Sequence, residues 1–332
     1  MRQNNVVSNT SPTLKWICFK LRSLLEKAVK RNLAEGILLS GGLDTSVLAL
    51  IASKYVSLKA FTVALEGTSA PDVKYATLMA KKLGIKHFIR YFGENELYDA
   101  IRSVVKTVKS FDPMEVRNST AVYVALKMVK EENLSMVMTG DGCDELFAGY
   151  DFLFNLEGEK LKLELERLWR VMSFSSVPLA ESLGLEAKLP YLDPHVKNFA
   201  FKLDPTYKVR DEKGRKWGKW ILRRAFEGAL PDKIVWRAKT PIEHGSGTTI
   251  LPALFENKIS YEEFQEKRRR YLENDKVTIR NKEQLFYYEV YRSAVGIPCS
   301  VNSVKRGKVC PYCNSNMDEG VTYCRICGAY PV

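Results

Sequence analysis

Short apolar runs alternate with helical patterns along residues 36–140. Apolar runs of strand length lie at 36–40, 58–65, 86–92 and 134–140. Between them, the residue patterns predict helices over 45–56, 71–84, 95–108 and 117–132. Strands that alternate with helices of this length predict an α/β fold, in which a parallel sheet carries helices on both faces. Because ligands bind such sheets at the carboxyl ends of the strands, the residues that follow each strand are candidates for function.

The strand pattern fades after residue 150. Long charged amphipathic runs, such as those at 157–172 and 261–274, predict a mainly helical second half. Segment 298–308 has the composition of a linker, and four cysteines fall within the last 23 residues. The sequence therefore predicts three parts: an α/β domain over 1–150, a helical region over 151–300 and a small cysteine module over 305–332.

Composition narrows the class of protein. Hydrophobic residues make up 45% and charged residues 27% of the 332 residues, as in soluble globular proteins. The sequence has no apolar run of about 18 residues, which a membrane helix would need. The first ten residues are polar and lack the apolar core of a signal peptide. We therefore expect a cytoplasmic protein with no membrane partner.

The charge balance is basic. There are 51 Lys and Arg against 39 Asp and Glu, a net charge of +12, and segment 201–240 alone holds 12 basic and 5 acidic residues. Such a surplus attracts polyanions, including nucleotides, pyrophosphate and RNA. Charge by itself does not choose among them.

The strongest motif is the loop that runs from Ser40 to Ser46, with the sequence SGGLDTS, between the first predicted strand and its helix. Its two glycines let the backbone turn tightly and approach a ligand, and the N-terminus of the following helix suits an anion. It lacks the lysine of a Walker loop. A plain glycine turn in which Thr45 or Asp44 only caps the helix would have the same local pattern.

A second motif, TGDGCDELFAGY at 139–150, follows the fourth predicted strand. It carries three carboxylates, those of Asp141, Asp144 and Glu145. Acidic residues often occupy the N-terminus of a helix for purely structural reasons. Beside a phosphate loop, however, an acidic strand end is also where a magnesium ion would be shared.

The phosphate loop resembles the PP-loop, and the two motifs together resemble the synthetase domain of glutamine-hydrolysing asparagine synthetases. Segments 111–124, 184–196 and 216–239 resemble the same family in the same order, so that the resemblance covers residues 20–295. It implies an adenine nucleotide alpha hydrolase-like fold. It also implies an enzyme of amino-acid biosynthesis in which ATP adenylylates a side-chain carboxylate, pyrophosphate leaves, and ammonia attacks the acyl-adenylate.

The resemblance gives each matching residue a role. The residues that would hold the pyrophosphate of ATP and its magnesium are Ser40, Gly41, Gly42, Asp44, Thr45 and Ser46. The other nucleotide contacts would be Leu38, Val63, Thr139 and Gly140. Asp144 would join Asp44 at magnesium, and the catalytic Lys239 would face the alpha phosphate, where charge builds in the transition state. Arg117 is the candidate partner of the substrate carboxylate. Asp141 is the second catalytic candidate, in the position of a family glutamate that assists proton transfer from ammonia.

The chain also departs from the family pattern. Asp141 is one methylene shorter than the family's glutamate, so its reach falls by about 1.5 Å. Lys188 replaces an arginine, and the two are not interchangeable at a bidentate site. Cys143 replaces a small polar residue, and we interpret it as a packed thiol. Arg2 stands where the family's glutaminase domain has its nucleophilic cysteine, so we expect ammonia from solution or from a separate glutaminase subunit.

The C-terminal cysteines have the spacing of a metal site. Cys310, Cys313, Cys324 and Cys327 form two Cys-x2-Cys knuckles. In a cytosolic chain, four such thiolates predict a structural zinc ribbon without an open coordination position; an iron–sulfur cluster or a redox pair is the alternative. Ribbons of this kind contact RNA or protein, or only cap a fold. We assign no metal role to the isolated histidines, which are His87, His195 and His244.

Three functions compete at this stage. The first is a magnesium-dependent amide ligase that forms AMP and pyrophosphate and acts on a small carboxylate, aspartate by default. The second is a PP-loop tRNA-modifying enzyme that adenylylates a base and contacts RNA with its zinc ribbon. The basic segment and the ribbon favour it, whereas the five family segments oppose it. The third is a binding protein that has lost catalysis, and the presence of Asp44, Asp144 and Lys239 argues against it.

Overall fold

A computed structural model describes residues 12–212, 214–298 and 307–332. The polar segment at 1–11, Arg2 included, lies outside these residues, as does most of the predicted linker at 298–308.

The predicted sheet is present and has five parallel strands. Their order across the sheet is β3 (Lys86–Phe92), β2 (Lys59–Leu65), β1 (Gly36–Leu38), β4 (Met136–Met138) and β5 (Glu186–Lys188). The central strand β1 pairs with β4 so that Gly36 lies opposite Val137. The sheet continues from β1 to β2 and β3 on one side, and from β4 to β5 on the other. This reversal of strand order is the place where such sheets open a crevice for a ligand at their carboxyl edge.

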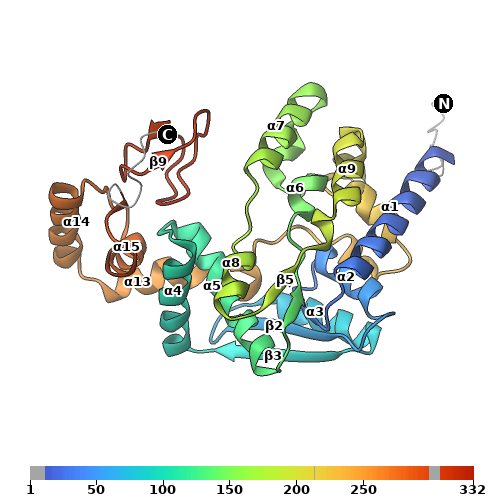
Figure 1. The fold of residues 1–332 in the computed structure, drawn as a ribbon, viewed down its shortest axis with the longest axis horizontal. Helices are drawn as coiled ribbons and strands as arrows, with labels where there is room; N and C mark the ends of the chain where they lie inside the picture. The colour runs from blue at the N-terminus through green and yellow to red at the C-terminus, as the bar shows by residue number, and fades with distance from the viewer. Residues whose placement is uncertain (1–11, 213, 299–306) are drawn as a thin grey trace.

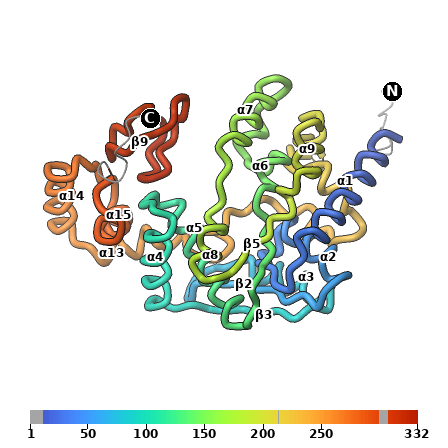
Figure 2. Tube along the Cα trace, in the orientation of Figure 1, coloured from blue at the N-terminus to red at the C-terminus, as the bar shows by residue number. Residues whose placement is uncertain are grey.

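Helices cover both faces of the sheet, which confirms the predicted α/β class (Figures 1 and 2). One layer consists of α1 (Pro12–Arg31), α2 (Leu43–Ala52) and α3 (Pro71–Leu83). The other consists of α4 (Glu94–Val108), α5 (Pro113–Glu131) and α8 (Ser176–Ser182). Because side chains alternate across a strand, Met138 joins the core of the first layer and Val137 that of the second.

The second half is mostly helical, as predicted. Helix α6 (Cys143–Phe147) directly follows β4. The remaining helices of the second half are α7 (Gly158–Val171), α9 (Pro194–Lys202), α10 (Trp220–Phe226), α11 (Asp232–Val235), α12 (Ile242–Ser246), α13 (Leu251–Lys258), α14 (Tyr261–Asp275) and α15 (Lys282–Ala294). A hairpin joins β6 (Arg210–Glu212) to β7 (Arg215–Trp217). Short 3-10 turns are η1 (Asp151–Asn155), η2 (Pro190–Leu192), η3 (Pro205–Tyr207) and η4 (Thr248–Ile250). The edge strand β5 also comes from this half, which the sequence pattern did not predict. The predicted domain boundaries at 150 and 300 stay predictions.

The cysteine module lies beside α15 and the start of α5 (Figure 1). Its strands β8 (Lys308–Val309) and β9 (Asn316–Met317) form an antiparallel pair. Within the described residues, no helix combines the length and the apolar character needed to cross a bilayer.

Candidate active site

The phosphate loop leads from β1 directly into α2. Gly41 adopts a left-handed conformation (φ 65°), and a side chain there would collide with the backbone of Tyr75 and Ala76 in α3. Helix α2 begins after Gly42, and no side chain caps it. The Thr45 hydroxyl instead accepts a hydrogen bond from the Ser40 amide at 3.3 Å. The alternative in which Thr45 or Asp44 caps the helix is therefore wrong, and the first N–H groups of α2 remain available for an anion.

The loop and the acidic motif meet because β1 and β4 are neighbours. Gly140 makes the approach possible, since a Cβ atom at this position would lie 3.0 Å from the Thr45 methyl and 3.3 Å from Asp44 Cβ. The hydroxyl of Tyr191 also donates to the Asp44 carbonyl, at 3.0 Å. Thr139 and Gly140 thus lie beside the phosphate loop, as the resemblance implied for nucleotide contacts, although their contact with nucleotide stays a prediction.

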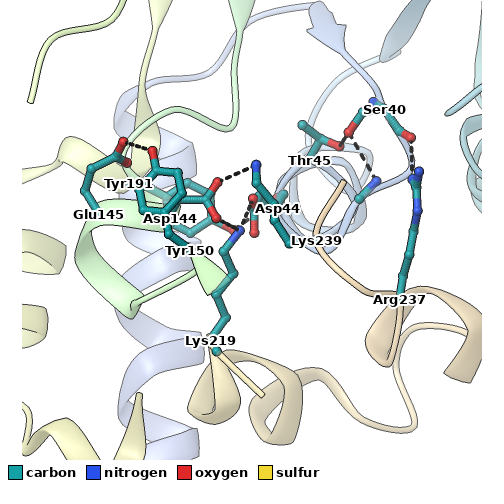
Figure 3. A network of polar contacts seen from close by, with 12 residues as sticks. Ser40, Asp44, Thr45, Asp144, Glu145, Tyr150, Tyr191, Lys219, Arg237 and Lys239 are labelled. Atoms are coloured by element: carbon teal, nitrogen blue, oxygen red, sulfur yellow. Dashed lines mark hydrogen bonds and ion pairs between the residues drawn. The ribbon is translucent and has the colours of Figure 1, made fainter. Parts of the chain in front are cut away.

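Two carboxylates and two lysines form a network at the centre of this site (Figure 3). Lys219 Nζ lies 2.5 Å from Asp44 Oδ2 and 2.6 Å from Asp144 Oδ1, while Lys239 Nζ lies 2.9 Å from Asp144 Oδ2. The Lys219 side chain is 4% exposed and that of Lys239 is 26% exposed. The four charges cancel, and Lys239 is the lysine that remains open to an arriving phosphate.

The network shifts the pKa values of Asp144 and Lys219. Burial works against the charge on Asp144, but Lys219 and Lys239 outweigh it and lower the pKa of this carboxyl. Burial likewise opposes the charge on Lys219, but Asp144 and Asp44 raise the pKa of its ammonium. Gly149 leaves the space for this pair, because a Cβ atom there would collide with both Asp144 and Lys219.

Asp44 has the environment of a metal ligand. Its Oδ1 atom and the hydroxyl of Ser46 are buried without a hydrogen-bond partner among the described residues. Buried oxygens without partners are costly unless a ligand or ion satisfies them, and magnesium in nucleotide sites takes one or two carboxylates plus phosphate oxygens. Asp44 and Ser46 therefore fit the predicted magnesium site. Asp144 Oδ1 is likewise buried without a hydrogen bond in the described part of the chain, although Lys219 Nζ lies 2.6 Å from it, so the predicted role of Asp144 at magnesium stays a prediction.

Asp141 accepts hydrogen bonds from two hydroxyls. Thr139 Oγ1 donates to Asp141 Oδ2 at 2.9 Å, and Ser176 Oγ donates to the same oxygen. Burial raises the pKa of Asp141, and the two hydroxyls only partly offset this effect. A carboxylate with a raised pKa and fixed geometry suits a general base. Ser176, on α8, is thus the residue that orients the shorter acid.

Arg117 has two acidic partners within the chain. Its Nη1 atom lies 2.8 Å from Glu283 Oε2, and its Nε atom donates to Glu243. The predicted role of Arg117 toward a substrate carboxylate stays a prediction, and a substrate would have to compete with these two acids. Lys188, which replaces a family arginine, pairs with Glu186 at 2.6 Å.

The other predicted residues lie where their strands place them. Leu38 is half-buried at the end of β1, and Val63 is buried in β2, so their contact with a nucleoside stays a prediction. Cys143 is buried; burial, and then the Asp44 charge, raise the pKa of its thiol well above the ordinary value. This environment supports the interpretation of Cys143 as a packed, unreactive thiol.

The four module cysteines have the geometry of a tetrahedral site. Their Sγ atoms all lie within 4.8 Å of one another, and the Cys310–Cys327 and Cys313–Cys324 pairs are each separated by 3.7 Å. A tetrahedron with Zn–S bonds of about 2.3 Å places sulfurs about 3.8 Å apart. Disulfide bonds of about 2.05 Å do not match, and the cysteines of a multi-iron cluster bind separate irons and spread farther. The donor set therefore fits one zinc ion.

Sequence reasoning missed three residues of the site, which are Lys219, Arg237 and Ser176. Arg237 donates to the Ser40 carbonyl at 2.9 Å and pairs with Asp72 at 2.5 Å, so it ties the phosphate loop to α3. Lys219 and Arg237 are two of 12 basic residues in 201–240, and the family resemblance of segment 216–239 is the one sequence signal that could have singled them out.

A phosphate loop at the reversal point of a parallel sheet, next to a buried carboxylate–lysine network, defines the class of protein as an α/β nucleotide-binding domain. The profile of the asparagine synthase family matches residues 20–183 and 178–291. The chain belongs to the asparagine synthase family.

Known relatives agree with this assignment. The chain is 30% identical over 316 residues to asparagine synthetase B [glutamine-hydrolyzing] of Escherichia coli, covering 87% of this chain and 56% of that protein. It is 32% identical to the glutamine-hydrolyzing asparagine synthetase of Sandersonia aurantiaca, covering 74% and 51%. The chain thus spans about half the length of these relatives. Among solved structures, the NMN synthetase of Francisella tularensis is a distant similarity, with a TM-score of 0.38, 14% identity, and coverage of 86% of this chain and 94% of that one.

Proposed function

We propose that the chain is an ATP-dependent amide ligase that forms AMP and pyrophosphate, with aspartate as its default substrate and ammonia as the nitrogen donor. The observation that carries the proposal is the network in which Lys219 joins Asp44 to Asp144 while Lys239 stays partly exposed beside them. The ammonia is free or comes from a separate glutaminase subunit.

In the first step, a carboxylate oxygen of the substrate attacks the alpha phosphorus of ATP. A bond forms between this oxygen and phosphorus, the bond to the bridging oxygen of the beta phosphate breaks, and pyrophosphate leaves. The uncapped N-terminus of α2 and the hydroxyls of Ser40 and Thr45 would hold the leaving pyrophosphate. Magnesium, held by Asp44 Oδ1 and Ser46 Oγ, would neutralise phosphate charge.

Lys239 would act on the reacting phosphate. It pairs with only one oxygen of Asp144, and its side chain is the most exposed of the four in the network. Turning its ammonium toward the alpha phosphate would stabilise the negative charge that builds there. Lys219 remains with both acids, so Asp144 would not be left as an unpaired buried charge.

In the second step, ammonia attacks the acyl carbon and AMP leaves with one oxygen of the original carboxylate. The attacking nitrogen must lose a proton. Asp141, whose pKa is raised by burial, would accept it, and Ser176 would hold the carboxylate toward the reacting centre.

The test is product analysis with the full chain, ATP, magnesium, ammonium and aspartate labelled with ¹⁸O in its side-chain carboxylate. We expect AMP, pyrophosphate and asparagine, with one ¹⁸O atom transferred to AMP. Asp44→Ala should lower the rate by about 100-fold or more, whereas the control Asp99→Ala, on the exposed face of α4, should not.

Other outcomes separate the alternatives. Formation of ADP would overturn the proposal. Pyrophosphate release that requires tRNA, and ignores a panel of small carboxylates, would favour the tRNA-modifying enzyme. A chain that binds ATP but releases no pyrophosphate with either substrate would favour a protein without catalysis.

A further inference from the structure

The second knuckle of the cysteine module, at Cys324–Cys327, contacts the start of α15. Gln284 Nε2 donates to the carbonyl of Cys327 at 2.8 Å. Arg280 donates to the same carbonyl at 2.5 Å and to that of Gly328 at 3.0 Å. Glu283, in the same turn, pairs with Arg117. One helical turn thus contacts both the module and the predicted substrate arginine.

The same knuckle binds the start of α5. The amide of Phe111 donates to the carbonyl of Ile326 at 2.8 Å, and the Ser110 hydroxyl donates to that of Arg325 at 2.7 Å. The hydroxyl of Tyr323 donates to Asp112, the residue whose side chain caps α5. Gly328 packs so closely on this carboxylate that a Cβ atom would collide with it. The module therefore fixes the first turn of α5, the helix that carries Arg117.

A third contact reaches the connection between α7 and α8. The guanidinium of Arg325 donates to the carbonyl of Val171. This connection leads into Ser176, which donates to Asp141. All three segments held by residues 323–328 therefore lead to a predicted site residue or to its direct partner: Arg117 on α5, its partner Glu283 on α15, and Ser176 on α8, the partner of Asp141.

We infer that the four-cysteine module positions the residues predicted to act on the substrate carboxylate and on proton transfer. Its bound metal would fix the arrangement of the three segments through residues 323–328. The residues that contact the three segments belong to the second knuckle or flank its cysteines. The orientation of these residues therefore depends on the bound metal. A module of this size buries little apolar surface, and a metal supplies most of its order. The inference rests on the proposed function for its kinetic consequence, but not for its structural one.

The structural test is hydrogen exchange of the full chain, zinc-loaded and after treatment with a chelator. We expect faster exchange after metal removal in segments 110–118, 171–177 and 280–288, in addition to the module. The phosphate-loop segment at 40–50, which the module does not contact, should exchange at the same rate in both forms. Faster exchange confined to residues 307–332 would overturn the inference, whatever the enzyme catalyses.

The kinetic test uses variants that keep all four cysteines. Arg280→Ala and Gln284→Leu should retain one zinc per chain, raise the KM for the carboxylate by about fivefold, as loss of one hydrogen bond does, and leave the KM for ATP unchanged. Lys282→Ala, in the same turn but paired with Glu256, is the matched control. Equal increases in both KM values, or none, would contradict a positioning role. If no carboxylate supports turnover of the parent chain, the proposed function fails, while the exchange result still decides the inference.

Discussion

The Nζ atom of Lys219 lies 2.5 Å from Oδ2 of Asp44, so a lysine from the second half of the chain neutralises the acid of the phosphate loop. The same nitrogen lies 2.6 Å from Asp144. Lys219 thereby connects the residues that follow β1 and β4. It is held there by its own amide, which donates to the Phe147 carbonyl at 2.9 Å.

Removing this lysine should destabilise the fold. Lys219→Met leaves Asp44 and Asp144 buried without their shared cation, and breaking a buried pair costs about 3–5 kcal/mol. Chemical denaturation should show a loss of this size. Lys216→Met, which removes a half-buried lysine paired with the exposed Glu157 in the same segment, should change stability by less than about 0.5 kcal/mol. Adding Asp144→Asn to Lys219→Met should restore part of the stability without restoring activity. A fully stable Lys219→Met single variant would contradict the described pairing.

The hydroxyl of Ser176 should set the pH dependence of turnover. Burial raises the pKa of Asp141, and the Ser176 hydrogen bond opposes this by favouring the charged form. Ser176→Ala should raise this pKa further, so the acid limb of the kcat profile should move to higher pH. Ser182→Ala, also on α8 but bonded to the Leu179 carbonyl, should leave the limb in place. An unchanged limb in Ser176→Ala would remove Asp141 as the proton acceptor.

A buried lysine away from the site should make stability depend on pH. Lys208 is 1% exposed and lies 4.5 Å from the centre of the Trp169 ring, and burial lowers the pKa of its ammonium to about 7. Between pH values of about 7 and 10.5, the Lys208 amine binds a proton in the unfolded chain but not in the folded chain. The contribution of Lys208 to the free energy of unfolding therefore rises with pH. Lys208→Met should therefore stabilise by about 1–3 kcal/mol at pH 6 and by less at pH 9. The exposed Lys202→Met should show no such trend in urea titrations at the two pH values.

The cysteine module should hold one zinc ion. The Sγ separations match a tetrahedral site, so metal analysis of the purified chain should give one equivalent of zinc. Cys313→Ser should reduce this content, whereas Cys18→Ser, in α1, should not. Less than half an equivalent in the parent chain would count against the site, and an equivalent amount of iron would replace zinc as its metal.

Much of this architecture could be predicted from local pattern. The strand and helix signals over 36–140 gave β1 to β4 and α2 to α5 with their order, because the period of apolar residues reports how each segment is buried. The phosphate loop and the four cysteines were equally visible, because short, fixed spacings bring their groups together. Strand β5 was not, because two of its three residues, Glu186 and Lys188, are charged and form no apolar run, and helix α1 precedes the alternating segment.

The sequence by itself determined the residues that must be close along the chain: Ser40 to Ser46 at one strand end, Asp141 and Asp144 at another, and the two cysteine knuckles. Only the tertiary structure decided which distant partners complete them. It brought Lys219 to Asp44, Ser176 to Asp141, and Arg117 to Glu283 rather than to open solvent. The physical reason is that a charge has the same chemistry anywhere in a sequence, and its role depends on burial and on the neighbours that folding provides.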